Sequence, residues 1–160
     1  MGLPLVGGPF VLETGDGRVL TDKAMLGHPF LVYFGYTHCP DICPTELARI
    51  GAVFGLLPDK PVRALFVTVD PERDTPQVMA DYVSSFDKRI VGLSGAPEAV
   101  AAVARVYRVY ARKGDAKPDG AYSVDHTSVV YLMDSSGVFV EAFNLDRPPE
   151  EAAKELAGYL

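Results

Sequence analysis

The sequence predicts an α/β fold in which a mixed central sheet is flanked by helices. Short apolar runs typical of buried strands alternate with segments of helical periodicity, and the chain closes with a hairpin pattern and a final helix. With 160 residues, of which 48% are hydrophobic and 22% charged, the chain has the size and composition of a globular domain. We therefore expect residues 1–160 to form a single domain, with residues 1–9 as a flexible N-terminal segment.

The first half of the chain supplies a hairpin, a strand and a helix. Residues 10–20 are expected to form an N-terminal β-hairpin around Thr14-Gly15-Asp16-Gly17. Residues 30–34 form a continuous apolar run, which is typical of a strand covered on both faces. A helix should follow, opened by Pro44 and carrying Glu46 in its first turn. Its apolar face is predicted to hold Leu47, Ile50, Phe54 and Leu57.

The second half continues the alternation. Strands are predicted over residues 62–69 and 90–93, and a closing hairpin over 128–133 and 138–143. Residues 148–160 should form the last helix, with Pro149 in its first turn. The apolar faces of the two intervening helices are marked by Val78, Tyr82, Val83 and Phe86, and by Val100, Val103, Tyr107 and Tyr110.

Charge and hydropathy exclude two broad classes of protein. The formal net charge is −6 and there is no basic run, so we expect no nucleic-acid partner. A membrane-spanning helix needs about 20 apolar residues. The longest stretch of apolar residues and glycine here covers only residues 50–57, so no spanning helix is expected.

The two cysteines are the main functional signal. Cys39 and Cys43 follow the first core strand and lie at the start of a helix, an arrangement typical of a thioredoxin-like fold. The N-terminus of a helix favours the thiolate, which is the form that binds metal or attacks a disulfide. The pair could chelate one ion or form a disulfide, although its spacing is not the C-x-x-C of redox thioredoxins. Two buried, inert cysteines are a less favoured alternative.

Histidine could supply a third ligand. His126 directly precedes a predicted strand and follows a long loop, residues 111–125, that is rich in Lys, Gly and Pro. Such a histidine can also be purely structural. Two thiolates and one imidazole suit copper, or zinc with an open fourth position. His38, next to Cys39, could tune the thiolate or simply face water, and His28 is interpreted as a solvated turn residue.

Four segments of the sequence, in this order along the chain, together resemble one known family. The chain resembles the Sco (SenC-type) copper proteins, and the resemblance runs from about Phe10 to the C-terminus. The segments that carry it are Tyr36-Thr37-His38-Cys39-Pro40-Asp41-Ile42-Cys43-Pro44, Val69-Asp70-Pro71-Glu72-Arg73-Asp74-Thr75-Pro76, Tyr107-Arg108-Val109-Tyr110 and Val124-Asp125-His126-Thr127-Ser128.

This resemblance implies a thioredoxin-like fold and a mononuclear copper site, Cu(I) or Cu(II), with Cys39, Cys43 and His126 as ligands. It further implies a metallochaperone that helps to assemble the copper centre of cytochrome c oxidase, by copper delivery or by thiol reduction of the acceptor. The implied partners are the copper-bearing oxidase subunit and a further copper chaperone or thiol reductant. The implied location is the periplasmic side of the inner membrane or the mitochondrial intermembrane space, with an N-terminal anchor that this chain lacks.

Acidic residues near the predicted site have two interpretations each. Asp70 could contact a partner or the outer shell of the metal, or could only form an Asp-Pro turn. Asp74 or Thr75 is expected to cap the following helix. Asp125 could orient His126 or could be an ordinary loop carboxylate.

Two other functions fit the same cysteine pair. A thiol–disulfide oxidoreductase or thiol peroxidase would use Cys39 and Cys43 as attacking and resolving thiols and would not need His126. A copper or redox sensor would form complexes that depend on its metal state, without releasing copper.

Overall fold

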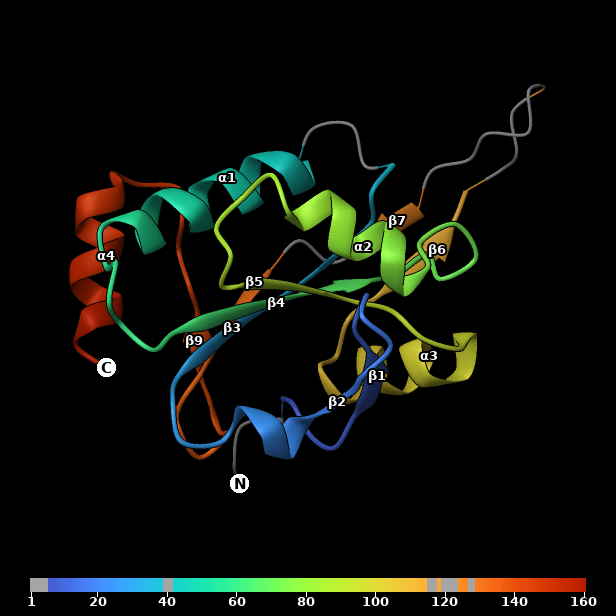
Figure 1. Ribbon diagram of the computed structural model, residues 1–160, viewed down its shortest axis with the longest axis horizontal. Coiled ribbons are helices and arrows are strands. Elements are labelled where there is room, and N and C mark those ends of the chain that lie inside the picture. Colours follow the sequence, from blue (N-terminus) through green and yellow to red (C-terminus); the bar gives the residue numbers. More distant parts are fainter. Residues whose placement is uncertain (1–5, 39–41, 115–117, 119–123, 127–128) are drawn as a thin grey trace.

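The computed structural model describes residues 6–38, 42–114, 118, 124–126 and 129–160, and only the backbone at 42, 112, 113, 125 and 126. Figure 1 shows a central sheet between two layers of other elements. In chain order, the elements are β1 (Val11–Glu13), β2 (Val19–Thr21), the 3-10 helix η1 (Asp22–Met25), β3 (Phe30–Gly35), α1 (Ile42–Gly55), β4 (Arg63–Thr68), α2 (Pro76–Val83), β5 (Ile90–Leu93), α3 (Pro97–Val106), β6 (Ala111–Lys113), β7 (Val124–His126), β8 (Val130–Met133), β9 (Phe139–Ala142) and α4 (Pro149–Ala157).

The central sheet is mixed, as the sequence predicts. Its strand order is β5-β4-β3-β8-β9. Strands β3, β4 and β5 are parallel, whereas β8 is antiparallel to β3 and β9 to β8. All six residues of β3 are buried because this strand lies in the middle of the sheet and is covered on both faces. The chain leaves β3 at the carboxyl end of the parallel strands. Residues 36–44, which include both cysteines and are called the cysteine segment below, begin there.

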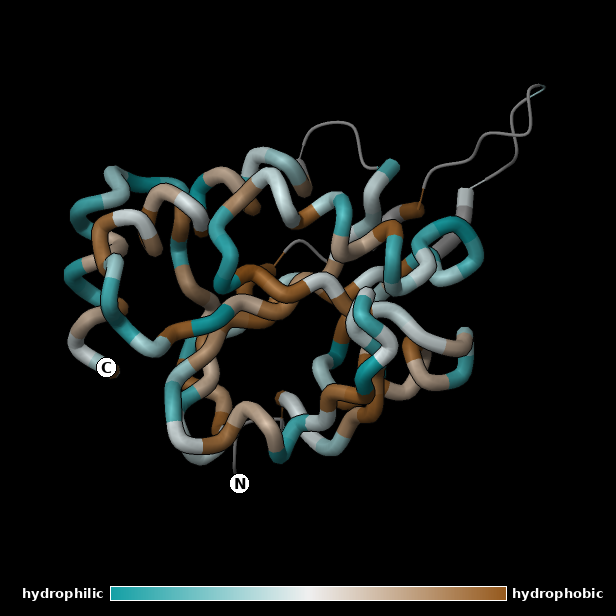
Figure 2. The backbone as a smooth tube through the Cα atoms, in the orientation of Figure 1, coloured by the Kyte–Doolittle hydropathy of each residue, from teal (hydrophilic) through white to brown (hydrophobic). Residues whose placement is uncertain are grey.

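Alternate residues of β3 enter two separate cores. Leu31 and Tyr33 pack in the core formed with α1, α2 and α4. Val32 and Phe34 pack in the core formed with α3, η1 and the β1–β2 hairpin. The period of two along a strand produces this division. In Figure 2, hydrophobic residues are concentrated along the central strands.

The expected N-terminal hairpin is confirmed, while the start of α1 differs from the prediction. The antiparallel pair β1–β2 closes around the predicted turn. Helix α1 begins at Ile42 rather than at Pro44, so Cys43 itself is helical. Glu46 consequently lies beyond the first turn, and it accepts a hydrogen bond from Arg49 at 2.9 Å.

The region after α3 holds two further differences. Tyr110 was expected on the buried face of α3, but the helix ends at Val106 and Tyr110 is 57% exposed. The helix cannot continue because Arg108 adopts a left-handed backbone with φ of 59°. The predicted loop 111–125 contains β6 and the first two residues of β7, and these two strands pair antiparallel.

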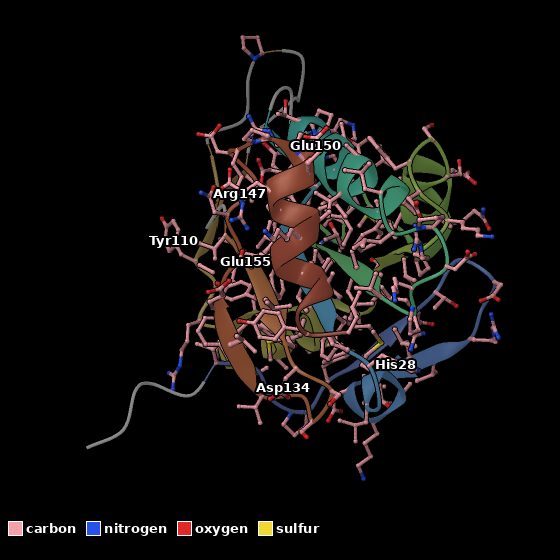
Figure 3. All side chains as sticks on the ribbon, turned by 90° about the vertical axis from the view of Figure 1, so that its left-hand side faces the viewer. His28, Tyr110, Asp134, Arg147, Glu150 and Glu155 are labelled. Atoms are coloured by element: carbon pink, nitrogen blue, oxygen red, sulfur yellow. The ribbon has the colours of Figure 1, made fainter. Side chains whose placement is uncertain are left out.

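Helix α4 completes the first core, with Pro149 in its first turn as expected. In Figure 3, Arg147 lies beside this helix, and its guanidinium contacts the carboxylate of Glu155. Near the other end of the chain, the Gly7 backbone N–H donates to the Val106 carbonyl at 2.7 Å. Flexibility of residues 1–9 stays a prediction, since 1–5 lie outside the described residues. No helix within the described ranges is long and apolar enough to cross a membrane.

Candidate metal centre

Cys43 lies in the first turn of α1 and is fully buried against the end of β3. Its sulfur fits there because Gly35 has no side chain. A Cβ at Gly35 would lie 2.5 Å from Cys43 Sγ and 2.8 Å from the Phe66 ring. The Tyr33 hydroxyl donates to Cys43 Sγ at 3.7 Å. The close packing and this donor hold the sulfur at the N-terminus of α1, where the helix dipole stabilises negative charge.

Asp74 anchors the segment that leads to the cysteines. This carboxylate is fully buried. It accepts from the Thr37 backbone N–H at 3.0 Å, from the Thr37 hydroxyl at 2.5 Å and from the Thr68 hydroxyl at 2.8 Å. Its own carbonyl oxygen accepts from the Ser94 hydroxyl. Asp74 thus ties together the carboxyl ends of the three parallel strands.

Of the two residues expected to cap α2, one is confirmed as the cap and the other is not. Thr75 is the N-cap residue, and its hydroxyl oxygen accepts from the Val78 N–H at 3.2 Å. Asp74 does not cap the helix because its carboxylate is directed to Thr37 and Thr68 instead. A buried carboxylate needs several donors, and these two threonines provide them.

Asp70 is buried on the same loop. Its carboxylate accepts from Arg73 Nε at 2.5 Å, and its backbone N–H donates to the Thr68 hydroxyl at 2.9 Å. The Arg73 guanidinium in turn lies 5.8 Å from the centre of the Tyr36 ring. This position is compatible with both interpretations of Asp70, as part of an Asp-Pro turn and as a contact for a partner or for the outer shell of the metal. Asp70 also restrains, through Arg73, a residue of the cysteine segment.

Strand β7, which carries His126, lies beside the cysteine segment. The Tyr36 hydroxyl accepts a hydrogen bond of 3.1 Å from the Val124 backbone N–H. Tyr36 precedes Cys39 by three residues, and Val124 precedes His126 by two. Figure 1 shows β7 next to the carboxyl end of β3. The fold thus brings together two segments that are 88 residues apart in sequence.

A recess of about 420 Å³ separates this strand pair from α3. Its lining includes Asp70 on one side, Val100 and Ala104 of α3 on another, and Ala111 and Val124 of the strand pair. Because of this recess, β6 and β7 are not closely packed against α3 along their whole length.

The remaining predicted site residues are placed only in part. Cys39 lies outside the described residues, as do the side chains of Asp125 and His126. The backbone of His126 is described, and it stands opposite Ala111 in the β6–β7 pair. His38 is exposed, with its Nδ1 at 3.3 Å from the Thr37 hydroxyl. The ligand set therefore stays a prediction, whereas the proximity of the two ligand-bearing segments is a structural finding.

Three residues of this region carry roles that the sequence did not reveal. Gly35 makes room for the sulfur, Tyr36 bonds to β7, and Asp74 anchors Thr37. Each role depends on a partner far away in the sequence. The sequence showed only that Gly35 and Tyr36 lie close to the cysteines and that Asp74 follows β4.

The donor types available in these segments are consistent with a soft metal. Cys43 supplies one sulfur, and the sequence adds a second sulfur at Cys39 and an imidazole at His126. Thiolates select Cu(I) and zinc, and imidazole suits both metals, so the residues fit a thiophilic ion.

Comparison with known sequences identifies the relatives of the chain. The family model SCO1/SenC matches residues 2–160. The protein SCO1 homolog, mitochondrial, of Mus musculus is 44% identical, with the match covering 100% of this chain and 58% of the relative. Its counterpart in Homo sapiens is 43% identical, with 100% and 54% covered. The chain thus spans little more than half the length of these curated relatives.

Comparison with solved structures agrees with the sequence match. The structure of Bradyrhizobium japonicum ScoI with copper bound superposes with a TM-score of 0.91 at 53% identity, covering 97% of this chain and 99% of the other. Yeast Sco1 with copper bound gives a TM-score of 0.84 at 38% identity, covering 98% and 91%. Both structures superpose over nearly the whole chain, and the shared fold is thioredoxin-like.

Proposed function

Because the chain belongs to the SCO1/SenC family, we propose that it is a copper-binding metallochaperone. Cys39, Cys43 and His126 hold one copper ion, and the protein serves the assembly of the copper centre of cytochrome c oxidase. Relatives with 53% and 38% identity have been crystallised with copper bound, which supports copper as the ion in this chain.

The observation that carries the proposal is the contact between the two ligand-bearing segments. The 3.1 Å hydrogen bond from Val124 to Tyr36 holds β7 against the segment that enters the cysteine pair. A dithiol enzyme would need only the cysteines, and nothing in its chemistry requires a histidine strand at this place. The contact therefore favours a three-ligand metal site over a thiol–disulfide oxidoreductase or a thiol peroxidase.

The ligand set accounts for both loading and release. Two thiolates favour Cu(I), and Cu(II) can bind when a further ligand or water completes the site. The cysteines and the histidine must lose protons to bind, so copper retention weakens in acid. A disulfide between Cys39 and Cys43 removes two of the three donors. Oxidation of the pair to the disulfide therefore releases copper. When the oxidant is a disulfide of the acceptor, it takes up the two electrons and two protons of the Cys39 and Cys43 thiols and becomes a pair of thiols itself.

The proposed partner is the copper-bearing subunit of cytochrome c oxidase, with another copper chaperone or a thiol reductant acting upstream. The proposed location is the mitochondrial intermembrane space or the periplasm. The relatives named as mitochondrial proteins support the first of these compartments.

The proposal is tested by copper titration of the reduced protein, followed by mixing with an apo copper domain of cytochrome c oxidase. We expect one copper per chain and transfer to the acceptor. Cys39→Ser and Cys43→Ser should lose stoichiometric binding, and His126→Ala should bind copper more weakly. His28→Ala is the matched control because His28 is exposed and precedes β3 at the opposite end of that strand (Figure 3).

Three outcomes would contradict the proposal. Unchanged copper affinity in His126→Ala would remove the imidazole from the site. Rapid turnover of a disulfide or peroxide that survives His126→Ala, without transfer of copper, would identify a thiol enzyme instead. A complex that depends on the metal state but retains its copper would identify a sensor.

A further inference from the structure

We propose that the Tyr36 hydroxyl is a positioning group for the metal site, because it fixes strand β7 and thereby places His126 next to the cysteine pair. The inference rests on the proposed function, in which His126 is a ligand. It assigns a role to a side chain that itself binds no metal.

The two partners of this contact are both buried. Tyr36 is 3% exposed and Val124 is 6% exposed. The Val124 backbone N–H donates to the Tyr36 hydroxyl at 3.1 Å, and Tyr36 directly follows β3 while Val124 opens β7. This is a direct bond between the segment that enters the cysteine pair and the strand that carries the histidine.

The Tyr36 side chain is itself held in place. The Arg73 guanidinium stacks over its ring at 5.8 Å from the centroid, and Arg73 is paired with the buried carboxylate of Asp70. The next residue, Thr37, is bonded to Asp74 through both its backbone N–H and its hydroxyl. The hydroxyl of Tyr36 is therefore an acceptor at a defined position rather than at the end of a mobile side chain.

Strand β7 depends on this acceptor more than a strand of the central sheet would. It has three residues, and within the described part of the chain it pairs only with the three residues of β6; isolated two-stranded pairs are marginal in water. The recess of about 420 Å³ removes part of the packing between this pair and α3. Without the hydroxyl, the buried Val124 N–H would lose this acceptor, and the strand would have to shift to satisfy it.

The effect on metal binding follows from preorganisation. A histidine strand that is held in place before the metal arrives does not have to be ordered during binding. One hydrogen bond contributes a modest net free energy, so loss of the hydroxyl should weaken copper binding about three- to ten-fold. The Cys43 sulfur should be less affected, because it accepts from the Tyr33 hydroxyl and fills the space left by Gly35.

The test is Tyr36→Phe, which deletes one oxygen and keeps the ring. Tyr159→Phe is the matched control, since Tyr159 lies beyond α4 at the C-terminus and is 41% exposed. Two quantities are measured: hydrogen exchange of the Val124 amide in the metal-free protein, and copper affinity of the reduced protein. We expect faster exchange at Val124 and the stated loss of affinity in Tyr36→Phe, with neither change in Tyr159→Phe.

The proposal is overturned if Tyr36→Phe leaves Val124 exchange and copper affinity at their wild-type values. It is also overturned if exchange quickens while affinity stays constant, since the bond would then be structural only. Failure of the proposed function has a different signature: wild type and His126→Ala would bind copper equally well, whatever the exchange rate at Val124.

Discussion

The two ends of helix α1 are built for different purposes. At the C-terminal end, the Arg89 guanidinium donates to the Leu57 and Phe54 carbonyls, both at 2.6 Å, and stacks over the Phe54 ring at 5.0 Å from its centroid. Asp87 holds the same guanidinium through two hydrogen bonds of 3.0 Å. At this end, a half-buried cation satisfies the Phe54 carbonyl of the helix and the Leu57 carbonyl just beyond it.

At the N-terminal end, the helix carries Cys43 in its first turn. The sulfur fills the space left by Gly35 and accepts from the Tyr33 hydroxyl. Positive helix-dipole charge, which an acidic first-turn residue could have offset, is here available to the sulfur. Loss of the Arg89 contacts at the C-terminal end should therefore lower stability and leave metal binding intact, whereas disturbing the sulfur at the N-terminal end should affect both.

The largest expected effect is at the structural end. Arg89→Met removes the donors to two carbonyls and leaves Asp87 without its guanidinium partner. We expect the free energy of unfolding to fall by about 3 kcal/mol, because two half-buried carbonyls lose charge-assisted hydrogen bonds. Urea unfolding of the metal-free protein measures this loss, and copper titration should give the wild-type affinity.

Arg18→Met is the control for this prediction. Arg18 pairs with Asp16 on the hairpin turn, but its side chain is 81% exposed. An exposed ion pair contributes little to stability. An equal loss of stability in both variants would show that the contacts of Arg89 stabilise the fold no more than an exposed ion pair does. A large loss of copper affinity in Arg89→Met would show that the two ends of α1 are coupled.

The second effect is at the metal end. Gly35→Ala places a Cβ at 2.5 Å from Cys43 Sγ and 2.8 Å from the Phe66 ring, so the sulfur or the ring must move. We expect a loss of about 2 kcal/mol in unfolding free energy from overpacking. Unlike Arg89→Met, this variant should also bind copper more weakly. Gly55→Ala, at the other end of α1, is the control because nothing lies within 4 Å of its Cβ position.

Gly55→Ala should leave copper affinity unchanged and stability equal or slightly higher, since alanine restricts the unfolded chain more than glycine does. Wild-type copper affinity in Gly35→Ala would contradict the assignment of Gly35 to the sulfur site.

The smallest expected effect is on how stability depends on pH. The hydrogen bond from Arg89 lowers the pKa of Asp87 below its usual value. In the folded protein Asp87 therefore binds a proton less readily than in the unfolded chain. Its contribution to stability is present above the usual pKa of a carboxyl group and is lost as the pH falls through the lowered value. Metal-free Asp87→Asn should lose stability less steeply on acidification than wild type, as followed by unfolding at pH 7 and at stepwise lower pH.

The regular elements of the fold were predictable because each carries its own periodic signal. The buried run at residues 30–34 and the short strand at 90–93 appear as β3 and β5. The strands β6 and β7 were missed because three residues are too few to establish a period of two. The end of α3 was misplaced because the apolar pattern continues to Tyr110 although Arg108 has already left the helix.

The candidate ligands were predicted from their chemistry and stay a prediction, whereas the contacts between their segments could not be predicted. Cys39, Cys43 and His126 were selected from donor type and from the resemblance, and their segments are adjacent in the fold as far as the described residues extend. The roles of Tyr36 and Asp74 depend on partners 88 and 37 residues away, and no local pattern encodes such pairs. The sequence predicts Asp74 as a helix cap because the preference for caps is local, whereas its burial is a tertiary property.

The most direct test of the three-ligand site is X-ray absorption spectroscopy at the copper edge, with the reduced protein loaded with one equivalent of Cu(I). We predict two sulfur neighbours and one imidazole nitrogen in the wild type, and loss of the imidazole scattering alone in His126→Ala. An identical spectrum in both proteins, or a single sulfur neighbour in the wild type, would contradict the account.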